Sequence, residues 1–311
     1  MERALFSGYA PAHARLVCID SDGCAFDTME IKHKECFCPA TIHAWGLQPI
    51  SKYVREAWDF GNLYSRDRGR SRFYELQLVF RLLSEREEVR RTGFVLPDIT
   101  SFCRWTAGAP VLNNDALRAE AERTGDPVLR RALDWSLEMN RRAAEMVYGI
   151  PPFPGVRESL IRLSGEADIA IVSATPREAL EREWAEHDLM RYVHQLCAQE
   201  DGTKKECIAA LKPFYAPADV LMIGDAPGDL EAAHGNGVLY YPIRPGEELE
   251  SWQAFCEEGL SRFLDGTFSG DYETDQIARF TACLPTVPPW RRQALSPSSA
   301  GAKKTSCNNG F

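Results

Sequence analysis

The sequence predicts a doubly wound α/β fold, a parallel sheet between helices, with an all-helical domain inserted near its beginning. Short, continuously apolar segments end in turn or polar residues, and helical segments separate them. Continuous rather than alternating apolarity indicates that both faces of each strand are covered, as in parallel sheets. A long interval after the first apolar segment carries helical stretches and no convincing core strand. Together these observations favour an α/β core with a helical insertion.

Five apolar segments are the candidate strands. They lie at residues 15–19, 169–172, 194–198, 220–223 and 238–242, and the segments at 194–198 and 238–242 are the weaker ones. The other three run directly into polar residues, which are Asp20 and Asp22, then Ser173 and Thr175, then Asp225 and Asp229.

Helices are expected between the strands, at residues 177–189, 205–214 and 230–235. Thr175 is the expected N-cap of the first of these helices, and Pro176 its first helical residue. A hydroxyl can accept a hydrogen bond from a free backbone N–H there, and proline has no N–H to satisfy. The insertion carries helical stretches at 71–89, 114–123 and 126–146.

The chain is expected to divide into four parts. These are a core in residues 1–27 and 151–245, a helical cap in 28–150, a C-terminal helical extension of the core in 246–284 and a disordered tail in 285–311. The polar turn after Gly23 and the proline-rich segment 151–155 are plausible hinges for the cap. The tail is rich in Pro, Ser, Ala, Lys and Asn, a composition that buries too little apolar surface to fold.

The composition excludes several classes of partner. The formal net charge of −9 repels phosphate backbones, so a nucleic-acid partner is not expected. No apolar run approaches the roughly 20 residues needed to cross a bilayer, and the N-terminus has no signal-peptide core. We therefore expect a cytoplasmic protein without a membrane partner. The ten cysteines follow no metal-binding spacing and are expected to be reduced.

Polar side chains gather where the three best strands end. In open parallel sheets, functional groups collect just beyond the carboxyl ends of the strands. Several carboxylates at one edge would repel each other unless a cation neutralised them, and Mg²⁺ prefers such oxygen ligands together with water and substrate phosphate. The sequence therefore predicts a magnesium site at this edge of the sheet.

Four motifs along the chain resemble those of the haloacid dehalogenase superfamily. Asp20-Ser21-Asp22-Gly23, with Asp27-Thr28 after it, resembles the first motif, DxDGxxxD[ST]. Ser173 resembles the second, Gly202-Thr203-Lys204 the third, and Gly224-Asp225 with Asp229 the fourth, GDxxxD. The resemblance covers residues 14–30 and 150–245, and the insertion lies where that superfamily carries its helical cap. It implies a Rossmann-like core.

The resemblance also implies a Mg²⁺-dependent phosphatase that forms an aspartyl-phosphate. Asp20 would be the nucleophile, and Asp22 would protonate the leaving oxygen and then deprotonate the attacking water, so that its pKa should be raised. Mg²⁺ would be held by Asp20, by the backbone carbonyl of Asp22 and by Asp225, with Asp229 acting behind them or through water. Ser173 and Lys204 would hold phosphate oxygens, with Lys205 as the alternative lysine. Asp229 is equally consistent with a helix cap.

The substrate should be a small phosphate monoester, chosen largely by the cap. The candidate contacts are Gly23, Thr175, Asn62, Tyr64, Arg66, Arg70 and Arg72. Asp22 favours phosphate esters over carbon–halogen bonds, which need no acid for the leaving group. A phosphomutase of the same superfamily, or a non-catalytic phospho-acceptor or metal-binding relative, remains an alternative. The particular ester and the oligomeric state do not follow from the sequence.

Overall fold

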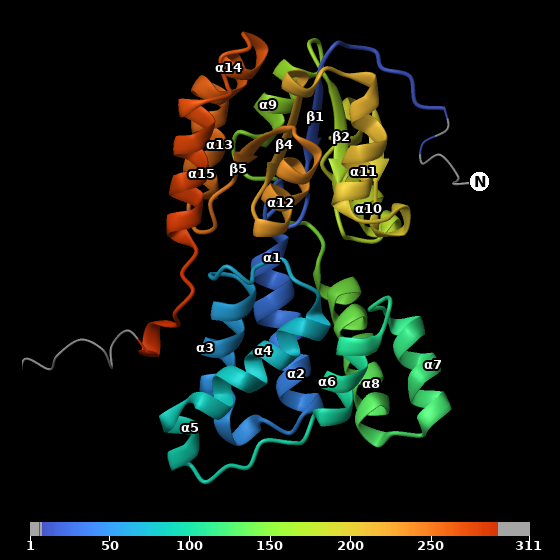
Figure 1. Ribbon diagram of the computed structural model, residues 1–311, viewed down its shortest axis with the longest axis vertical. Coiled ribbons are helices and arrows are strands. Elements are labelled where there is room, and N and C mark those ends of the chain that lie inside the picture. The colour runs from blue at the N-terminus through green and yellow to red at the C-terminus, as the bar shows by residue number, and fades with distance from the viewer. Residues whose placement is uncertain (1–5, 7, 292–311) are drawn as a thin grey trace, which may run out of the picture.

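The computed structural model describes residue 6 and residues 8–291. Within these residues, five parallel strands form one sheet in the order β3-β2-β1-β4-β5. The strands are β1 (Leu16–Ile19), β2 (Asp168–Val172), β3 (Gln195–Cys197), β4 (Val220–Gly224) and β5 (Leu239–Pro242). Helices cover the sheet, and a separate group of helices lies beyond its carboxyl edge (Figure 1). The predicted α/β fold class is confirmed.

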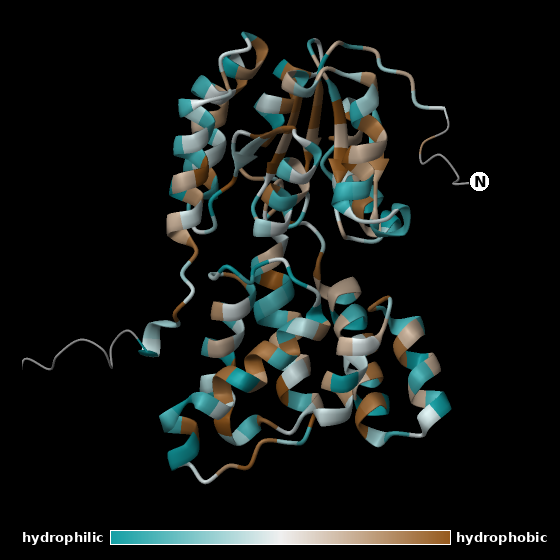
Figure 2. Ribbon diagram, viewed as in Figure 1, coloured by the Kyte–Doolittle hydropathy of each residue, from teal (hydrophilic) through white to brown (hydrophobic). Residues whose placement is uncertain are grey.

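The alternating side chains of the central strand explain why the sheet needs helices on both faces. Val17 and Ile19 belong to one hydrophobic cluster, and Leu16 and Cys18 belong to another. All four are fully buried, which gives the strand the continuous apolarity visible in its sequence (Figure 2). β1 pairs with β2 and β4, so the residues that follow these three strands share one edge.

Seven α-helices of the described chain accompany the sheet. They are α9 (Val156–Leu163), α10 (Arg177–Glu186), α11 (Lys204–Leu211), α12 (Pro227–Asn236), α13 (Glu248–Ala254), α14 (Leu260–Leu264) and α15 (Asp271–Cys283). The prediction that Thr175 caps the first helix after β2 was wrong. Pro176 is the N-cap of α10, without a side-chain cap, and Thr175 Oγ1 donates instead to Asp22. An N-terminal cap does hold at α11, where Thr203 and Glu206 form a capping box.

Residues 28–146 form a helical unit with its own hydrophobic cluster. Its α-helices are α1 (Thr28–Ile31), α2 (Cys38–Ala44), α3 (Ser51–Asn62), α4 (Arg72–Glu85), α5 (Glu87–Arg91), α6 (Thr100–Gly108), α7 (Asn114–Thr124) and α8 (Pro127–Met146), with a π-helical segment, Lys32–Phe37, between α1 and α2. Trp45, Trp58 and Trp135 lie in this cluster. The helix expected over 71–89 is two helices, because Arg86 between them has extended backbone dihedrals. No helix in the described part of the chain is both long and apolar enough to cross a membrane.

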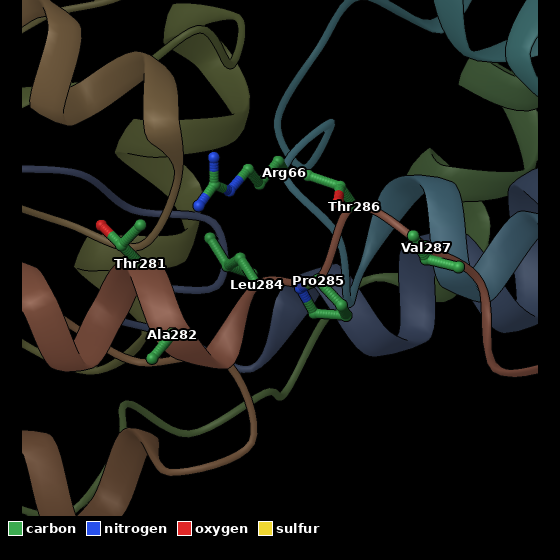
Figure 3. Close-up of a pocket in the computed structure, with 7 residues that line it drawn as sticks. All are labelled: Arg66, Thr281, Ala282, Leu284, Pro285, Thr286 and Val287. Atoms are coloured by element: carbon green, nitrogen blue, oxygen red, sulfur yellow. The ribbon is translucent and has the colours of Figure 1, made fainter. Parts of the chain in front are cut away.

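The segment after α15 differs from the expected disordered tail. Residues 285–291 run from the sheet toward the helical unit (Figure 1), and Trp290 packs against that unit's hydrophobic cluster. The guanidinium of Arg86 lies 4.5 Å from the centre of the Trp290 ring, an arrangement that favours cation–π attraction. A pocket of about 390 Å³ lies where this segment passes Arg66. Figure 3 shows the residues that line it. The rest of the expected tail, residues 292–311, lies outside the described residues.

Asp168, at the other end of the sheet, ties the N-terminal segment to β2. Its Oδ1 accepts a hydrogen bond from His13 Nδ1 (2.9 Å), and its Oδ2 accepts from Tyr215 Oη (2.6 Å) and from the backbone N–H of Ala12 (3.0 Å). Burial alone would raise the pKa of Asp168, but the hydrogen bonds from Tyr215 and His13 outweigh it and lower the pKa. The carboxylate therefore stabilises the fold in its ionised form.

His194 lies beside the same carboxylate, and the three groups His13, Asp168 and His194 are close enough to hold a metal ion. However, Nδ1 of His194 accepts a hydrogen bond from the backbone N–H of Ile169 (3.0 Å). In the neutral ring Nε2 then carries the proton and has no lone pair for a metal. We interpret this group as a hydrogen-bonded anchor.

Asp168→Asn is expected to lower the free energy of unfolding by roughly 1–3 kcal/mol at pH 7, because a buried acceptor of several hydrogen bonds is replaced. Since the pKa of Asp168 is lower in the folded protein, its contribution is present above the unfolded pKa of 3.8 and is lost as the pH falls through the folded value. Urea unfolding between pH 7 and pH 3 should show the difference between wild type and variant shrinking. Asp219→Asn, at a half-exposed pair with Arg15, is the control. A difference that stays constant with pH would contradict this assignment.

Candidate active site

Asp20, Asp225 and Asp229 meet at the carboxyl edge of the sheet. β1 and β4 are in register, and the backbone N–H of Asp20 continues the ladder by donating to Ile223 O (3.0 Å). Asp20 and Asp225 therefore leave neighbouring strands at the same level, and Asp229 follows on α12. Each of the three buried carboxylates offers an oxygen within 4.8 Å of the others.

The positive charges of Lys204 and Arg68 compensate these three carboxylates only in part. Burial raises the pKa of Asp20 to about 8, because Asp229 and Asp225 add to the effect and Lys204 only partly offsets it. Burial likewise raises the pKa of Asp225 to about 6, against the opposing effect of Arg68. Asp225 Oδ1 is buried without a hydrogen-bond partner. An all-oxygen site with an unpaired buried oxygen fits a hard divalent cation such as Mg²⁺.

Lys204 is the lysine that reaches the acidic edge. Its Nζ lies 2.6 Å from Asp20 Oδ2 and 2.5 Å from Asp229 Oδ1. Burial alone would lower the pKa of Lys204, but the two carboxylates outweigh it and raise the pKa. The side chain of Lys205 lies against Gly235, where a Cβ would meet its Cε at 3.0 Å. Of the two lysines, Lys204 is the one that the structure brings into contact with the carboxylates.

Asp229 caps α12, which is one of the two roles that its sequence position suggested, and it also pairs with Lys204. Its Oδ2 accepts hydrogen bonds from the backbone N–H groups of Asp225 (3.2 Å) and Ala226 (3.0 Å), which caps α12. Its Oδ1 pairs with Lys204. The hydrogen bonds that cap α12 therefore also fix the position of the Asp229 carboxylate that pairs with Lys204.

Asp22 lies in a different electrostatic environment from the one expected. Its Oδ1 accepts hydrogen bonds from Lys32 Nζ and from Thr28 Oγ1 (2.5 Å), and its Oδ2 accepts from Thr175 Oγ1 (2.7 Å). Burial alone would raise the pKa of Asp22, but Lys32, Thr28 and Thr175 lower it to about 2. The prediction of a raised pKa was wrong, because the nearest charge is a lysine of the helical unit rather than another carboxylate.

Gly23 and Ser173 border the same edge. Gly23 has a φ of +77°, and a Cβ there would lie 2.7 Å from Asp225 Oδ2, so no larger residue fits without displacement. Ser173 is buried directly after β2, and its Oγ accepts a hydrogen bond from the backbone N–H of Thr175 (3.4 Å). Gly23 therefore lies against Asp225, and Ser173 follows β2, the strand that pairs with β1.

The predicted arginine contacts of the helical unit do not reach the acidic edge. Arg66 is exposed beside the C-terminal segment, as Figure 3 shows. Arg70 pairs with Asp67 on its own loop (2.8 Å). Arg72 donates to Asn140 Oδ1 on α8 (2.6 Å). The structure shows no hydrogen bond or ion pair, among the residues it describes, between these three side chains and the strand-end carboxylates.

Asn62 and Tyr64 also have local partners. Asn62 is fully buried, and its Nδ2 donates to the backbone oxygen of Trp58 (2.9 Å). Tyr64 is half-exposed, and its hydroxyl donates to Glu30. Both therefore have structural contacts within the helical unit.

Three residues at this edge were missed from the sequence. Arg68 is buried, and its Nε and Nη2 lie 2.7 and 2.6 Å from Asp225 Oδ2. Lys32 pairs with Asp22. Glu183 Oε2 accepts a hydrogen bond from Ser21 Oγ (2.7 Å). In the sequence, Arg68 stands among several arginines, and Lys32 stands close to a second lysine, Lys34. The sequence does not distinguish the side chain of each group that reaches the acidic edge.

The parallel sheet places the chain among the Rossmann-like α/β proteins. The buried carboxylates and the lysine at the carboxyl edge of this sheet form a candidate active site. Residues 128–241 match the haloacid dehalogenase-like hydrolase family. The match includes Ser173, Lys204 and Asp225, and the structure brings Asp20 beside them.

Three solved structures illustrate what the chain is similar to. A haloacid dehalogenase-like family hydrolase from Streptococcus pneumoniae is 14% identical, over 80% of this chain and 98% of that chain, with a TM-score of 0.43. A protein from Haemophilus somnus described as a predicted phosphoglycolate phosphatase is 14% identical, over 73% and 84%, with a TM-score of 0.43. A haloacid dehalogenase-superfamily hydrolase from Geobacter sulfurreducens is 19% identical, over 76% and 89%, with a TM-score of 0.35. No curated protein has a significant match to the chain.

Proposed function

We propose that this protein is a Mg²⁺-dependent phosphatase that hydrolyses a small phosphate monoester through an aspartyl-phosphate on Asp20. The observation that carries the proposal is the convergence of Asp20, Asp225 and Asp229 with Lys204, around a buried carboxylate oxygen that has no partner. Phosphoryl transfer depends on positioning and on charge neutralisation, and this arrangement provides both.

Asp20 attacks phosphorus, and its ionised form is favoured by Lys204. The backbone N–H of Ser21 donates to Asp20 Oδ1 (2.8 Å), which orients the carboxylate. Asp20, the backbone carbonyl of Asp22 and Asp225 would hold Mg²⁺, with Asp229 behind them. When bound, Mg²⁺ neutralises the carboxylates and polarises a phosphate oxygen as a Lewis acid. Ser173 and Lys204 hold the remaining phosphate oxygens.

Asp22 serves as the acid and base. Its ionised form, which Lys32 favours, is the form that accepts a proton from the attacking water. Protonation of the leaving oxygen requires Asp22 to carry a proton first, so Lys32 must release it at that stage. An acid at this position suits an ester oxygen, whereas a halide leaves without a proton.

The helical unit acts as a cap over the site, hinged at the segments before α1 and after α8. Lys32 and Arg68 come from this unit and reach the acidic edge. Together with Lys204 they surround the edge with positive charge, which favours a small anionic ester over a neutral or polymeric substrate. The core in residues 1–27 and 151–245 supplies the chemistry, and the cap in residues 28–150 selects the substrate.

Phosphate release from a panel of small phosphate monoesters is expected to require Mg²⁺. The full chain should turn over at least one anionic ester with Mg²⁺, and EDTA should lower the rate by at least about 10²-fold, because a metal supplies several kcal/mol of charge stabilisation. Adding Mg²⁺ back in excess should restore the rate. Turnover that EDTA leaves unchanged would contradict the metal-dependent mechanism.

The same assay separates the alternatives. A phosphomutase would isomerise a sugar phosphate without net phosphate release. A non-catalytic phospho-acceptor would form a phosphorylated chain that persists after acid quenching, and it would show no turnover.

A further inference from the structure

Arg68 and Asp225 form a buried ion pair between the helical unit and the sheet. Their side chains are 3% and 2% exposed, and both Nε and Nη2 of Arg68 contact Asp225 Oδ2. The remaining nitrogen, Nη1, donates to the backbone oxygen of Leu63 (2.8 Å). The guanidinium is thus held on both sides, by the acidic edge and by its own loop.

Asp225 is at the same time a member of the carboxylate cluster that fits a divalent cation. One of its oxygens is occupied by Arg68, and the other has no partner. Gly23 leaves the space that the guanidinium uses, because a Cβ at Gly23 would collide with Arg68 Nη2 and with Asp225 Oδ2. Arg68 therefore supplies, from outside the sheet, positive charge that a metal would otherwise supply.

We propose that Arg68 competes with the divalent cation for Asp225 and so sets the affinity of the site for the metal. The inference rests on the proposed metal-dependent function and deepens it. The Arg68 guanidinium and a divalent cation would repel each other if both lay close to Asp225. The buried negative charge of Asp225 is stabilised by either of them. The apparent affinity for the metal is the intrinsic affinity reduced by the fraction of molecules in which Arg68 has left Asp225.

The competition also links the metal to the position of the loop between α3 and α4. Arg68 is the residue of this loop that is bonded to Asp225. Because coupling between two binding events is reciprocal, metal binding must weaken the attachment of the loop to the same degree as the loop weakens metal binding. Arg68 is in this sense a positioning residue for Asp225.

The test is a direct measurement of metal binding, with free Mn²⁺ followed by electron paramagnetic resonance during titration of the full chain. Arg68→Ala is expected to bind Mn²⁺ about tenfold more tightly than wild type, as removal of a competing contact predicts. Lys32→Ala is the matched control, since Lys32 also brings one positive charge from the helical unit, on a partly buried side chain, but pairs with Asp22. It should change the Mn²⁺ affinity by less than about threefold, because the Asp22 side chain is not a metal ligand in this scheme.

An unchanged or weaker affinity in Arg68→Ala would overturn the proposal, and so would an equal gain in Lys32→Ala, which would show a general charge effect. If Arg68→Ala does not fold, hydrogen exchange of residues 62–71 in the wild-type chain replaces it. Faster exchange on addition of Mn²⁺ supports the competition, and unchanged exchange overturns it. Failure of the proposed function gives a different result, namely no phosphate release from any ester of the panel, or phosphate release that EDTA does not affect.

Discussion

Asp20→Asn is expected to abolish steady-state phosphate release while leaving the protein at least as stable as wild type. The activity should fall by on the order of 10⁴-fold, as for other removed nucleophiles, because the amide cannot form the aspartyl-phosphate. The stability should not fall, because the raised pKa of Asp20 shows that its charge is unfavourable in the metal-free fold. The neutral amide removes repulsion from Asp225 and Asp229, which is expected to stabilise the fold by up to about 1 kcal/mol.

The kcat from phosphate release and the free energy of urea unfolding without Mg²⁺ measure these two effects. Asp219→Asn, a half-exposed aspartate before β4 at the far end of the sheet, should leave both close to wild type. Comparable turnover in wild type and Asp20→Asn would exclude Asp20 as the nucleophile. A clear loss of stability in Asp20→Asn would instead contradict the account of the site's charge.

Lys204→Met is expected to lower both activity and stability. The Nζ of Lys204 contacts Asp20 and Asp229, so its removal leaves buried carboxylates without that counter-ion. Breaking such a pair typically costs about 3–5 kcal/mol, and the partial exposure of this lysine puts the expected loss near the lower end. Turnover should fall by roughly 10²–10³-fold, since a donor to the transferring phosphoryl group is lost.

Lys205→Met provides the matched control, because Lys205 lies in the same first turn of α11 but its side chain lies against Gly235. Its variant should unfold and turn over like wild type. Mg²⁺ should restore part of the stability of Lys204→Met, because a bound cation neutralises the same carboxylates. Equal losses in the two variants would contradict the assignment of Lys204, and the absence of any rescue by Mg²⁺ would argue against a shared site.

The strands and the polar residues that follow them could be predicted from the sequence because their signals are local. A fully buried strand needs a continuous apolar run, and Asp20, Ser173 and Asp225 each come directly after one. A parallel sheet then brings strand ends to one edge, so the proximity of Asp20 and Asp225 follows from topology. The position of Lys204 was accessible in the same way, through the turn that begins α11.

The contacts of the helical unit could not be predicted in this way. Arg68 lies in a loop of several arginines that are chemically equivalent in the sequence, and it meets Asp225 only because the unit folds against the sheet. The residues around Thr175 predict that it caps a helix, but its hydroxyl donates a hydrogen bond to Asp22. In both cases a tertiary hydrogen bond to a carboxylate from a distant part of the chain decides where the side chain lies.

The sequence by itself determined the α/β core, the helical character of the insertion and the acidic edge, because periodicity and strand-end chemistry depend on neighbouring residues. Only the tertiary structure decided that Arg68 rather than Arg66, Arg70 or Arg72 reaches this edge, and that Lys32 lowers the pKa of Asp22. The physical reason is that burial and the nearest charge set the state of a carboxylate. Both depend on which distant segments pack over it.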